Sequence, residues 1–392
     1  MTGTVASAGS DRLSETLALR VARGELPGLV LLTARADEVR VQPIGTLTVD
    51  GTAPMRPDTL FRITSMTKPV VATVAMMLVE EGRLDLTEPV DRLLPELAGR
   101  RVLRRLDGPL DDTVAADRPT TVEDVLTYRI GHGMIFEPEF QPAFPIVTAT
   151  EKLGLAIGPP DPPAALTPDE WLRRFGTLPL MHQPGLHWQY DTAGQVLGVL
   201  VARAAGQPLP DLLRDRIFAP LGMVDTGFSV PAAQLDRLAG HYTKDPETGG
   251  LVARTISGPQ RWGIPPTFPA GASGLVSTAV DYLAFARLLR NRGVHGGVRL
   301  LSEESVARMT TNHLTPEQIT AAAVPVLDGR GWGYGLAVDI GPDRAAPPAY
   351  GWTGGYGTGW FTDPGRELIT IVLTQTDTFI FDGGWNEVRK LA

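Results

Sequence analysis

The sequence of 392 residues contains no cysteine, and this absence removes several kinds of chemistry at once. Disulfide bonds, thiolate nucleophiles and cysteine-ligated metals are all excluded. No phosphate-binding loop or dinucleotide-binding fingerprint occurs either. Histidine is scarce, and the spacing of a helical metal-binding motif is missing among the six that are present: His132, His182, His187, His241, His295 and His313. We therefore expect no metal and no cofactor, and we interpret these histidines as structural or solvent-facing.

Long apolar runs and long basic runs are also lacking. No stretch of about eighteen apolar residues is present, so the sequence predicts no membrane-spanning helix. The segment of residues 1–11 has neither the basic nor the apolar part of an export signal. The net charge is −8, and no long run of Lys or Arg occurs, which argues against nucleic acid or an anionic membrane as partner. These features predict a cytoplasmic protein, or one whose export signal has been removed.

One short stretch combines a serine, a lysine and an apolar helical pattern. Ser65 and Lys68 stand three residues apart, and apolar residues at helical spacing follow from position 70 to position 78. The pattern predicts a helix with one buried face that begins near Ser65, with the Lys68 ammonium in reach of the Ser65 hydroxyl. A lysine accepts a proton at neutral pH only when burial or a second cation lowers its pKa from about 10.4. The alternative is a helix-capping serine beside a solvated lysine, since Ser-x-x-Lys also occurs by chance.

The rest of the chain predicts strands at both ends and helices between them. The apolar runs within residues 28–49 are typical of antiparallel strands, and residues 28–33 are typical of a buried one. Near the other end, turn signals separate four short strand patterns, at residues 334–340, 350–353, 360–362 and 368–374. We therefore expect one sheet built from both chain ends, in an α/β domain of residues 1–85 and 270–392. Residues 86–269 would form a mostly helical, loop-rich insertion, with the active site between the two.

Several motifs together resemble those of one protein superfamily. The most specific motif covers residues 58–69 and continues at residues 80–86, and further landmarks lie at residues 271–277 and 331–336. By these motifs the chain resembles the serine β-lactamase and penicillin-binding-protein superfamily, most closely the class C β-lactamase-like branch with the family VIII carboxylesterases. The resemblance extends over residues 28–377. It implies a β-lactamase-like α/β (α+β) fold, in which helices flank an antiparallel sheet built from both chain ends and a mostly helical domain is inserted.

The resemblance also implies which residues act. The first motif of the superfamily places the nucleophile on Ser65 and its paired base on Lys68. The second motif places a proton-carrying tyrosine on Tyr190, and a phenol beside a lysine ammonium can act first as general base and then as general acid. The alternative for Tyr190 is an aromatic residue at a helix start that packs against Trp188.

The second motif departs from the β-lactamase pattern. Asp191 and Thr192 stand where serine or alanine and then asparagine are usual in the members that act on amides. The missing asparagine weakens the case for an amide substrate. If Asp191 is buried, its carboxylate would raise the pKa values of the lysine and the tyrosine.

The third motif, Lys-Thr-Gly in β-lactamases, falls on Trp352, Thr353 and Gly354. Trp352 cannot supply the cation that holds a β-lactam carboxylate, and family VIII esterases often carry tryptophan at this position. The resemblance implies that the backbone N–H groups of Ser65 and Gly355 form the oxyanion hole. The three residues of this motif, together with Asp191, are the predicted substrate-binding residues. The alternative is a glycine-rich strand end without such a role.

With these residues, the resemblance implies a serine hydrolase whose partner is a small-molecule ester. It would cleave carboxylic esters with small or short-chain acyl groups through an acyl-enzyme on Ser65. Trp352 and Thr192 favour esters over β-lactams. An amidase, D-peptidase, β-lactamase or acyltransferase would use the same residues, and a non-catalytic binding module with this fold is the alternative from another class. The Gly-x-Ser-x-Gly motif of α/β-hydrolases does not occur. We expect the loops around residues 134–184 and 255–270 to set the substrate preference.

Overall fold

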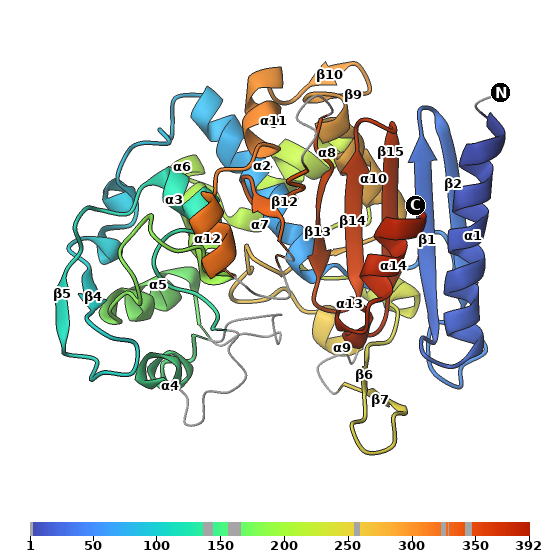
Figure 1. The fold of residues 1–392 in the computed structure, drawn as a ribbon, viewed down its shortest axis with the longest axis horizontal. Coiled ribbons are helices and arrows are strands. Elements are labelled where there is room, and N and C mark those ends of the chain that lie inside the picture. The colour runs from blue at the N-terminus through green and yellow to red at the C-terminus, as the bar shows by residue number, and fades with distance from the viewer. Residues whose placement is uncertain are drawn as a thin grey trace.

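The computed structural model describes residues 3–135, 144–155, 166–254, 259–322, 327, 329–341 and 347–392. Its main feature is a seven-stranded antiparallel sheet whose strands come from both ends of the chain (Figure 1). The predicted α/β (α+β) fold with such a sheet is therefore confirmed. Across the sheet the order is β11 (Gly331–Trp332), β12 (Ala337–Val338), β13 (Tyr350–Gly354), β14 (Thr358–Asp363), β15 (Leu368–Thr374), β1 (Gly28–Arg35) and β2 (Glu38–Gly45).

Strand β1 joins the two ends of the chain, and helices cover both of its faces. It pairs with β2 on one side and with β15 on the other, where Leu29 lies opposite Thr374. Leu29 and Leu31 pack with residues of α1 (Gly3–Ala22) and α14 (Gly384–Leu391). Val30 and Leu32 belong to the larger core on the other face, which includes α2 (Thr67–Glu80) and α10 (Ala279–Arg290). Because successive side chains of a strand alternate between faces, a strand covered on both reads as a continuous apolar run.

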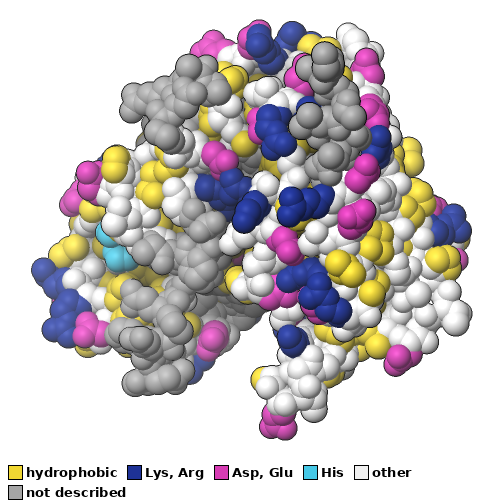
Figure 2. Space-filling view, turned by 45° about the vertical axis from the view of Figure 1, so that its right-hand side comes forward, with side chains coloured by type: hydrophobic (Ala, Val, Ile, Leu, Met, Phe, Trp, Pro, Cys, Tyr) yellow, Lys and Arg dark blue, Asp and Glu magenta, His cyan; other side chains and the backbone are white. Residues whose placement is uncertain are grey.

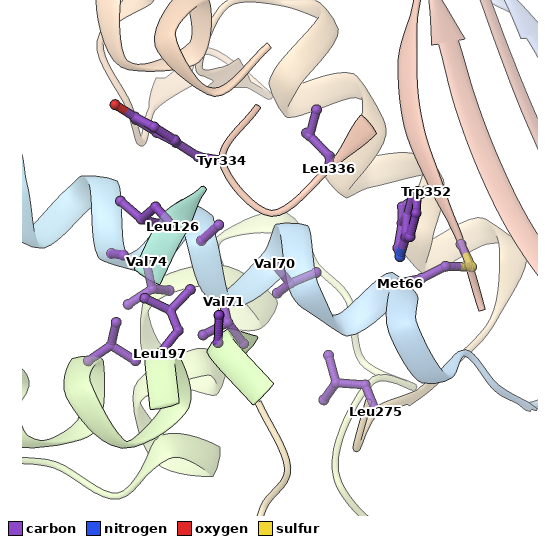
Figure 3. Close-up of a cluster of buried hydrophobic side chains, with 14 of the residues drawn as sticks. Met66, Val70, Val71, Val74, Leu126, Leu197, Leu275, Tyr334, Leu336 and Trp352 are labelled. Atoms are coloured by element: carbon purple, nitrogen blue, oxygen red, sulfur yellow. The ribbon is translucent and has the colours of Figure 1, made fainter. Parts of the chain in front are cut away.

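Helix α2 lies inside the molecule. All of its residues from Thr67 to Leu78 are buried, so the helix is enclosed on all sides instead of burying the single predicted face. Figure 3 shows Val70, Val71 and Val74 of this helix among Leu126, Leu197, Leu275 and Leu336, which come from four other segments. The segment just before α2 is thereby fixed in position.

The rest of the fold consists of further helices, short helical segments and two-stranded pairs (Figure 1). The further helices are α3 (Val122–Leu126), α4 (Pro145–Lys152), α5 (Pro168–Thr177), α6 (Thr192–Ala205), α7 (Leu209–Leu213), α8 (Ala219–Leu221), α9 (Pro259–Trp262), α11 (Glu303–Met309), α12 (Pro316–Ala321) and α13 (Thr378–Phe381). Short segments of other helix types are η1 (Thr64–Met66), η2 (Val90–Arg92), η3 (Pro95–Leu97), η4 (Arg214–Phe218) and η5 (Ala232–Arg237). Four two-stranded pairs join β3 (Phe61–Arg62) to β8 (Val276–Ser277), β4 (Arg101–Leu103) to β5 (Thr113–Ala115), β6 (Tyr242–Lys244) to β7 (Leu251–Ala253), and β9 (Val294–His295) to β10 (Val298–Arg299).

Two predicted strands differ from the structure. The pattern at residues 334–340 yields only the two residues of β12, because the preceding segment turns against α2. Gly335 has a φ of +74°, and a Cβ there would lie 2.9 Å from the Lys68 carbonyl oxygen. Residues 46–49 do not extend the meander, since Thr46 forms only an isolated bridge with Pro54. The domain division after residues 85 and 269 stays a prediction.

The described residues include no helix with both the length and the apolarity needed to cross a membrane. Basic and acidic side chains are interspersed over the coloured part of the face drawn in Figure 2. The absence of nucleic acid or an anionic membrane as partner, expected from the net charge, stays a prediction.

Candidate active site

Ser65 lies in a short turn that leads from the strand β3 into α2. The turn is the 3-10 helix η1, and Ser65 comes two residues before the first residue of α2, so its predicted place near the helix start is confirmed. Thr64 has a φ of +41°, which is uncommon and costly for a β-branched residue. Strain of this kind persists only where the surroundings hold the backbone, and it is concentrated at functional sites.

Lys68 lies in the first turn of α2, and its ammonium group meets three oxygen atoms. Its Nζ is 3.0 Å from the Ser65 Oγ, 2.9 Å from the Asp191 Oδ1 and 2.8 Å from the Ala272 carbonyl oxygen. The predicted contact between Lys68 and Ser65 is therefore confirmed. The Lys68 side chain has no exposed surface, which rules out the alternative of a solvated lysine.

The electrostatic surroundings of Lys68 differ from the prediction. Burial lowers the pKa of Lys68, but the Asp191 carboxylate and Tyr190 outweigh it, so that the pKa is raised above its ordinary value. The expectation that burial would bring this pKa down toward neutrality is therefore wrong. The expectation that a buried Asp191 would raise it is confirmed, since Asp191 is only 1% exposed.

Tyr190 is held between the lysine and the third motif. Its ring lies 4.4 Å from the Lys68 Nζ, measured to the ring centre, and its hydroxyl accepts a hydrogen bond of 2.8 Å from the indole Nε1 of Trp352. The ring also stacks on Trp188, with 5.7 Å between the ring centres. Tyr190 is thus both packed as an aromatic residue and in contact with Lys68 and Trp352.

Asp191 and Thr192 begin the helix α6. Asp191 has a φ of +80° and a ψ of −60°, and it directs its carboxylate to Lys68. The Thr192 hydroxyl lies 3.3 Å from the Nδ1 of His132. His132 is fully buried, and burial followed by the charge of Arg100 lowers its pKa to about 3. The imidazole is therefore neutral at physiological pH.

The third motif forms the last residues of β13. Trp352 is buried, and its side chain points toward the segment that carries Ser65 (Figure 3). Gly354 lies against the same segment, because a Cβ there would be 2.3 Å from the Ile63 carbonyl oxygen and 2.4 Å from the Thr64 Oγ1. Thr353 is 8% exposed, and Gly355 follows in the turn after the strand. The substrate-binding and oxyanion-hole roles of these residues stay predictions.

Four features of the site go beyond the sequence prediction. The Ala272 carbonyl contacts Lys68, although the sequence marks residues 271–277 only as a motif. Trp332 packs edge-on against Trp352, with 4.7 Å between the ring centres, and Arg330 places its guanidinium 5.4 Å from the centre of the Trp352 ring. A cation thus lies near the position where the motif lysine is missing. Tyr128 is fully buried beside Tyr190, and its hydroxyl has no hydrogen-bond partner among the described residues.

Other predicted elements cannot be placed. Parts of the two loops expected to set substrate preference, residues 136–143, 156–165 and 255–258, lie outside the described residues. Among the residues that are described, no group of three or more His, Asp and Glu side chains is arranged to hold a metal ion.

Comparison with known proteins identifies the family. The family model for Beta-lactamase matches residues 13–391. Protein Rv1367c of Mycobacterium tuberculosis (strain ATCC 25618 / H37Rv) is 40% identical over 362 residues, which cover 90% of this chain and 86% of the relative. Esterase EstB of Burkholderia gladioli is 32% identical over 375 residues, again covering 90% and 86% of the two chains.

Among solved structures, the fold matches that of EstCE1, described as a hydrolase with promiscuous acyltransferase activity. The TM-score is 0.79 at 25% sequence identity, and the match covers 99% of each chain. The chain therefore belongs to the beta-lactamase family, and the resemblance drawn from its motifs is confirmed.

Proposed function

We propose that this protein is a serine hydrolase that cleaves carboxylic esters with small or short-chain acyl groups. The contact between the Lys68 Nζ and the Ser65 Oγ, with the Tyr190 hydroxyl held beside them by Trp352, is the observation that carries the proposal. A serine becomes a nucleophile when a neighbouring group takes its proton, and this cluster offers such a group in a buried setting. The similarity to esterase EstB supports an ester as substrate.

The proposed reaction has two steps. The Ser65 Oγ attacks the ester carbonyl while its proton passes to the Lys68–Tyr190 pair, and the same pair returns a proton to the departing alcohol. The backbone N–H groups of Ser65 and Gly355 stabilise the negative oxygen of the tetrahedral intermediate. Water then attacks the acyl-enzyme, giving its proton to the pair and releasing the carboxylic acid, and Ser65 regains its proton.

Labelling and turnover of the same samples test the proposal. We expect a fluorophosphonate probe to add one adduct to the intact wild-type protein and none to Ser65→Ala. Wild type should hydrolyse p-nitrophenyl acetate and butyrate, and Ser65→Ala should not. Ser302→Ala is the matched control, because Ser302 caps α11 and lies outside the cluster, so this variant should keep both properties. Wild type without adduct or turnover would instead support a non-catalytic binding module.

Acyl transfer to an alcohol is the second candidate. The acyl-enzyme is the same, and the promiscuous acyltransferase activity of the structurally similar EstCE1 supports including it. Product analysis of a vinyl ester reaction with added benzyl alcohol separates the two: a hydrolase yields mainly the free acid, and an acyltransferase mainly the new ester. Turnover of nitrocefin or of a D-alanyl-D-alanine peptide faster than that of the esters would favour the β-lactamase or D-peptidase alternative.

A further inference from the structure

Asp191 lies at a position where an aspartate side chain normally caps a helix. It directly precedes the helix α6, where aspartate side chains commonly accept a hydrogen bond from the first backbone N–H groups of the helix. No such capping bond is made here. The carboxylate instead lies 2.9 Å from the Lys68 Nζ, 123 residues away in the sequence. The Asp191 carboxylate therefore contacts Lys68 instead of capping α6.

The backbone at Asp191 is bent to allow this contact. The Thr192 N–H donates to the Tyr190 carbonyl oxygen at 3.2 Å, and Asp191 between them has a φ of +80° and a ψ of −60°. These values belong to the rare γ-turn with positive φ, which is strained. Such strain is a reason to look for a functional role of the residue that bears it.

The contact determines the charge state of Lys68. The carboxylate and the ammonium are both buried, with 2% and 0% of their side-chain surface exposed. A neutral amine at this place would leave a buried carboxylate without its cation, which is strongly unfavourable. Lys68 is also surrounded by the Tyr190 ring and the Ala272 carbonyl oxygen, both of which favour a cation. Among the described residues, Asp191 is the acidic side chain that forms an ion pair with Lys68.

We propose that Asp191 is a positioning residue that keeps Lys68 charged, so that Lys68 donates to Ser65 and the Tyr190 oxygen receives the Ser65 proton. This inference rests on the proposed ester hydrolysis, and it assigns a separate role to each member of the Lys68–Tyr190 pair. Lys68 then acts as a fixed cation, and the raised Lys68 pKa is in keeping with that role. The aspartate performs this function from the position that the related amide-hydrolysing enzymes fill with serine or alanine.

The pH dependence of kcat/KM in Asp191→Asn tests the proposal, because asparagine keeps the shape and tolerates positive φ but carries no charge. Without the carboxylate, burial becomes the dominant influence and lowers the Lys68 pKa. We expect kcat/KM for p-nitrophenyl butyrate at pH 8 to fall at least tenfold, and its alkaline limb to move to lower pH by one unit or more. A variant that is merely misfolded would lose amplitude without moving that limb.

Asp281→Asn is the matched control. Asp281 is a buried aspartate in the first turn of α10, and its carboxylate accepts from the Asp225 N–H and the Thr226 hydroxyl, away from Lys68. This variant should lose stability in urea without moving the alkaline limb. An unchanged limb in an Asp191→Asn protein that unfolds in the same urea range as wild type would overturn the inference. Higher activity of this variant at neutral pH would also overturn it, because neutral Lys68 would then be the base. If wild type itself takes no fluorophosphonate label and hydrolyses no ester, the proposed function fails instead.

Discussion

The indole N–H of Trp352 donates a hydrogen bond of 2.8 Å to the hydroxyl of Tyr190, and both side chains are buried. The third motif therefore contributes a neutral donor to the tyrosine where a β-lactamase would offer a lysine. This donor orients the Tyr190 oxygen, and in the proposed mechanism it would stabilise negative charge that develops there. Trp352 therefore adds an interaction of its own, a hydrogen bond to Tyr190, at the position of the motif lysine.

Trp352→Phe removes this donor while keeping an aromatic ring. We expect kcat for p-nitrophenyl butyrate to fall about tenfold, which corresponds to the loss of one buried hydrogen bond of about 1–1.5 kcal/mol. Trp360→Phe is the control, because the Trp360 Nε1 donates to Thr362 on the same strand and does not touch Tyr190. Equal losses in the two variants would contradict a direct role of the Trp352 donor.

Lys68→Met tests the buried ion pair through stability. Methionine fills much of the same space but leaves the Asp191 carboxylate buried without a cation, so we expect about 3–5 kcal/mol less free energy of unfolding. Adding Asp191→Asn removes the stranded charge and should restore much of this stability, while ester hydrolysis stays absent. Urea denaturation of wild type, both single variants and the double variant measures the coupling. Additive losses would show that the two side chains do not stabilise each other.

Gly354→Ala tests the contact between β13 and the segment before Ser65. The new methyl group would meet the Ile63 carbonyl oxygen at 2.3 Å, and backbone atoms cannot yield cheaply. We expect loss of ester hydrolysis together with a lower unfolding midpoint. Gly365→Ala, where the nearest atom to a Cβ lies 3.4 Å away, is the control and should change neither. Full activity in Gly354→Ala would show that the strand end can move away from Ser65 without consequence.

His132 should make stability depend on pH. Burial and then Arg100 lower its pKa from 6.5 to about 3, so between these values the unfolded chain binds a proton that the folded protein does not. Stability is therefore full above about pH 6.5 and falls as the pH drops, by about 1.4 kcal/mol per pH unit from this residue. In His132→Gln the slope of unfolding free energy against pH between 4 and 6 should be smaller by about this amount. An unchanged slope would mean that His132 takes up its proton without unfolding.

Local sequence patterns predicted the parts of the fold and site that depend on neighbours along the chain. The Ser65–Lys68 contact follows from helical spacing, and the buried strand at residues 28–33 follows from its apolar run. The motifs also indicated Tyr190 and Trp352, which meet in the structure.

The remaining features depend on residues far apart in the sequence. The sequence predicted the raised pKa of Lys68 only on the condition that Asp191 is buried, and no spacing rule provides that burial or the distance from Asp191 to Lys68. The third acceptor of Lys68 is a backbone carbonyl, at Ala272, and a backbone atom leaves no signature in residue identity. The predicted strand at residues 334–340 was too long because Gly335 turns the chain against α2, a tertiary contact that outweighs strand propensity.

The pairing of β1 with β15 has a consequence for how the protein is made. The hairpin of β1 and β2 is synthesised first, and β15, the partner of its other edge, follows about 330 residues later. At ordinary translation rates of about 5–20 residues per second, this edge of β1 stays unpaired for tens of seconds. An unpaired strand edge of this kind is a template for association with other chains. The β1 edge of this protein therefore stays open to pairing with other chains until β15 has been synthesised.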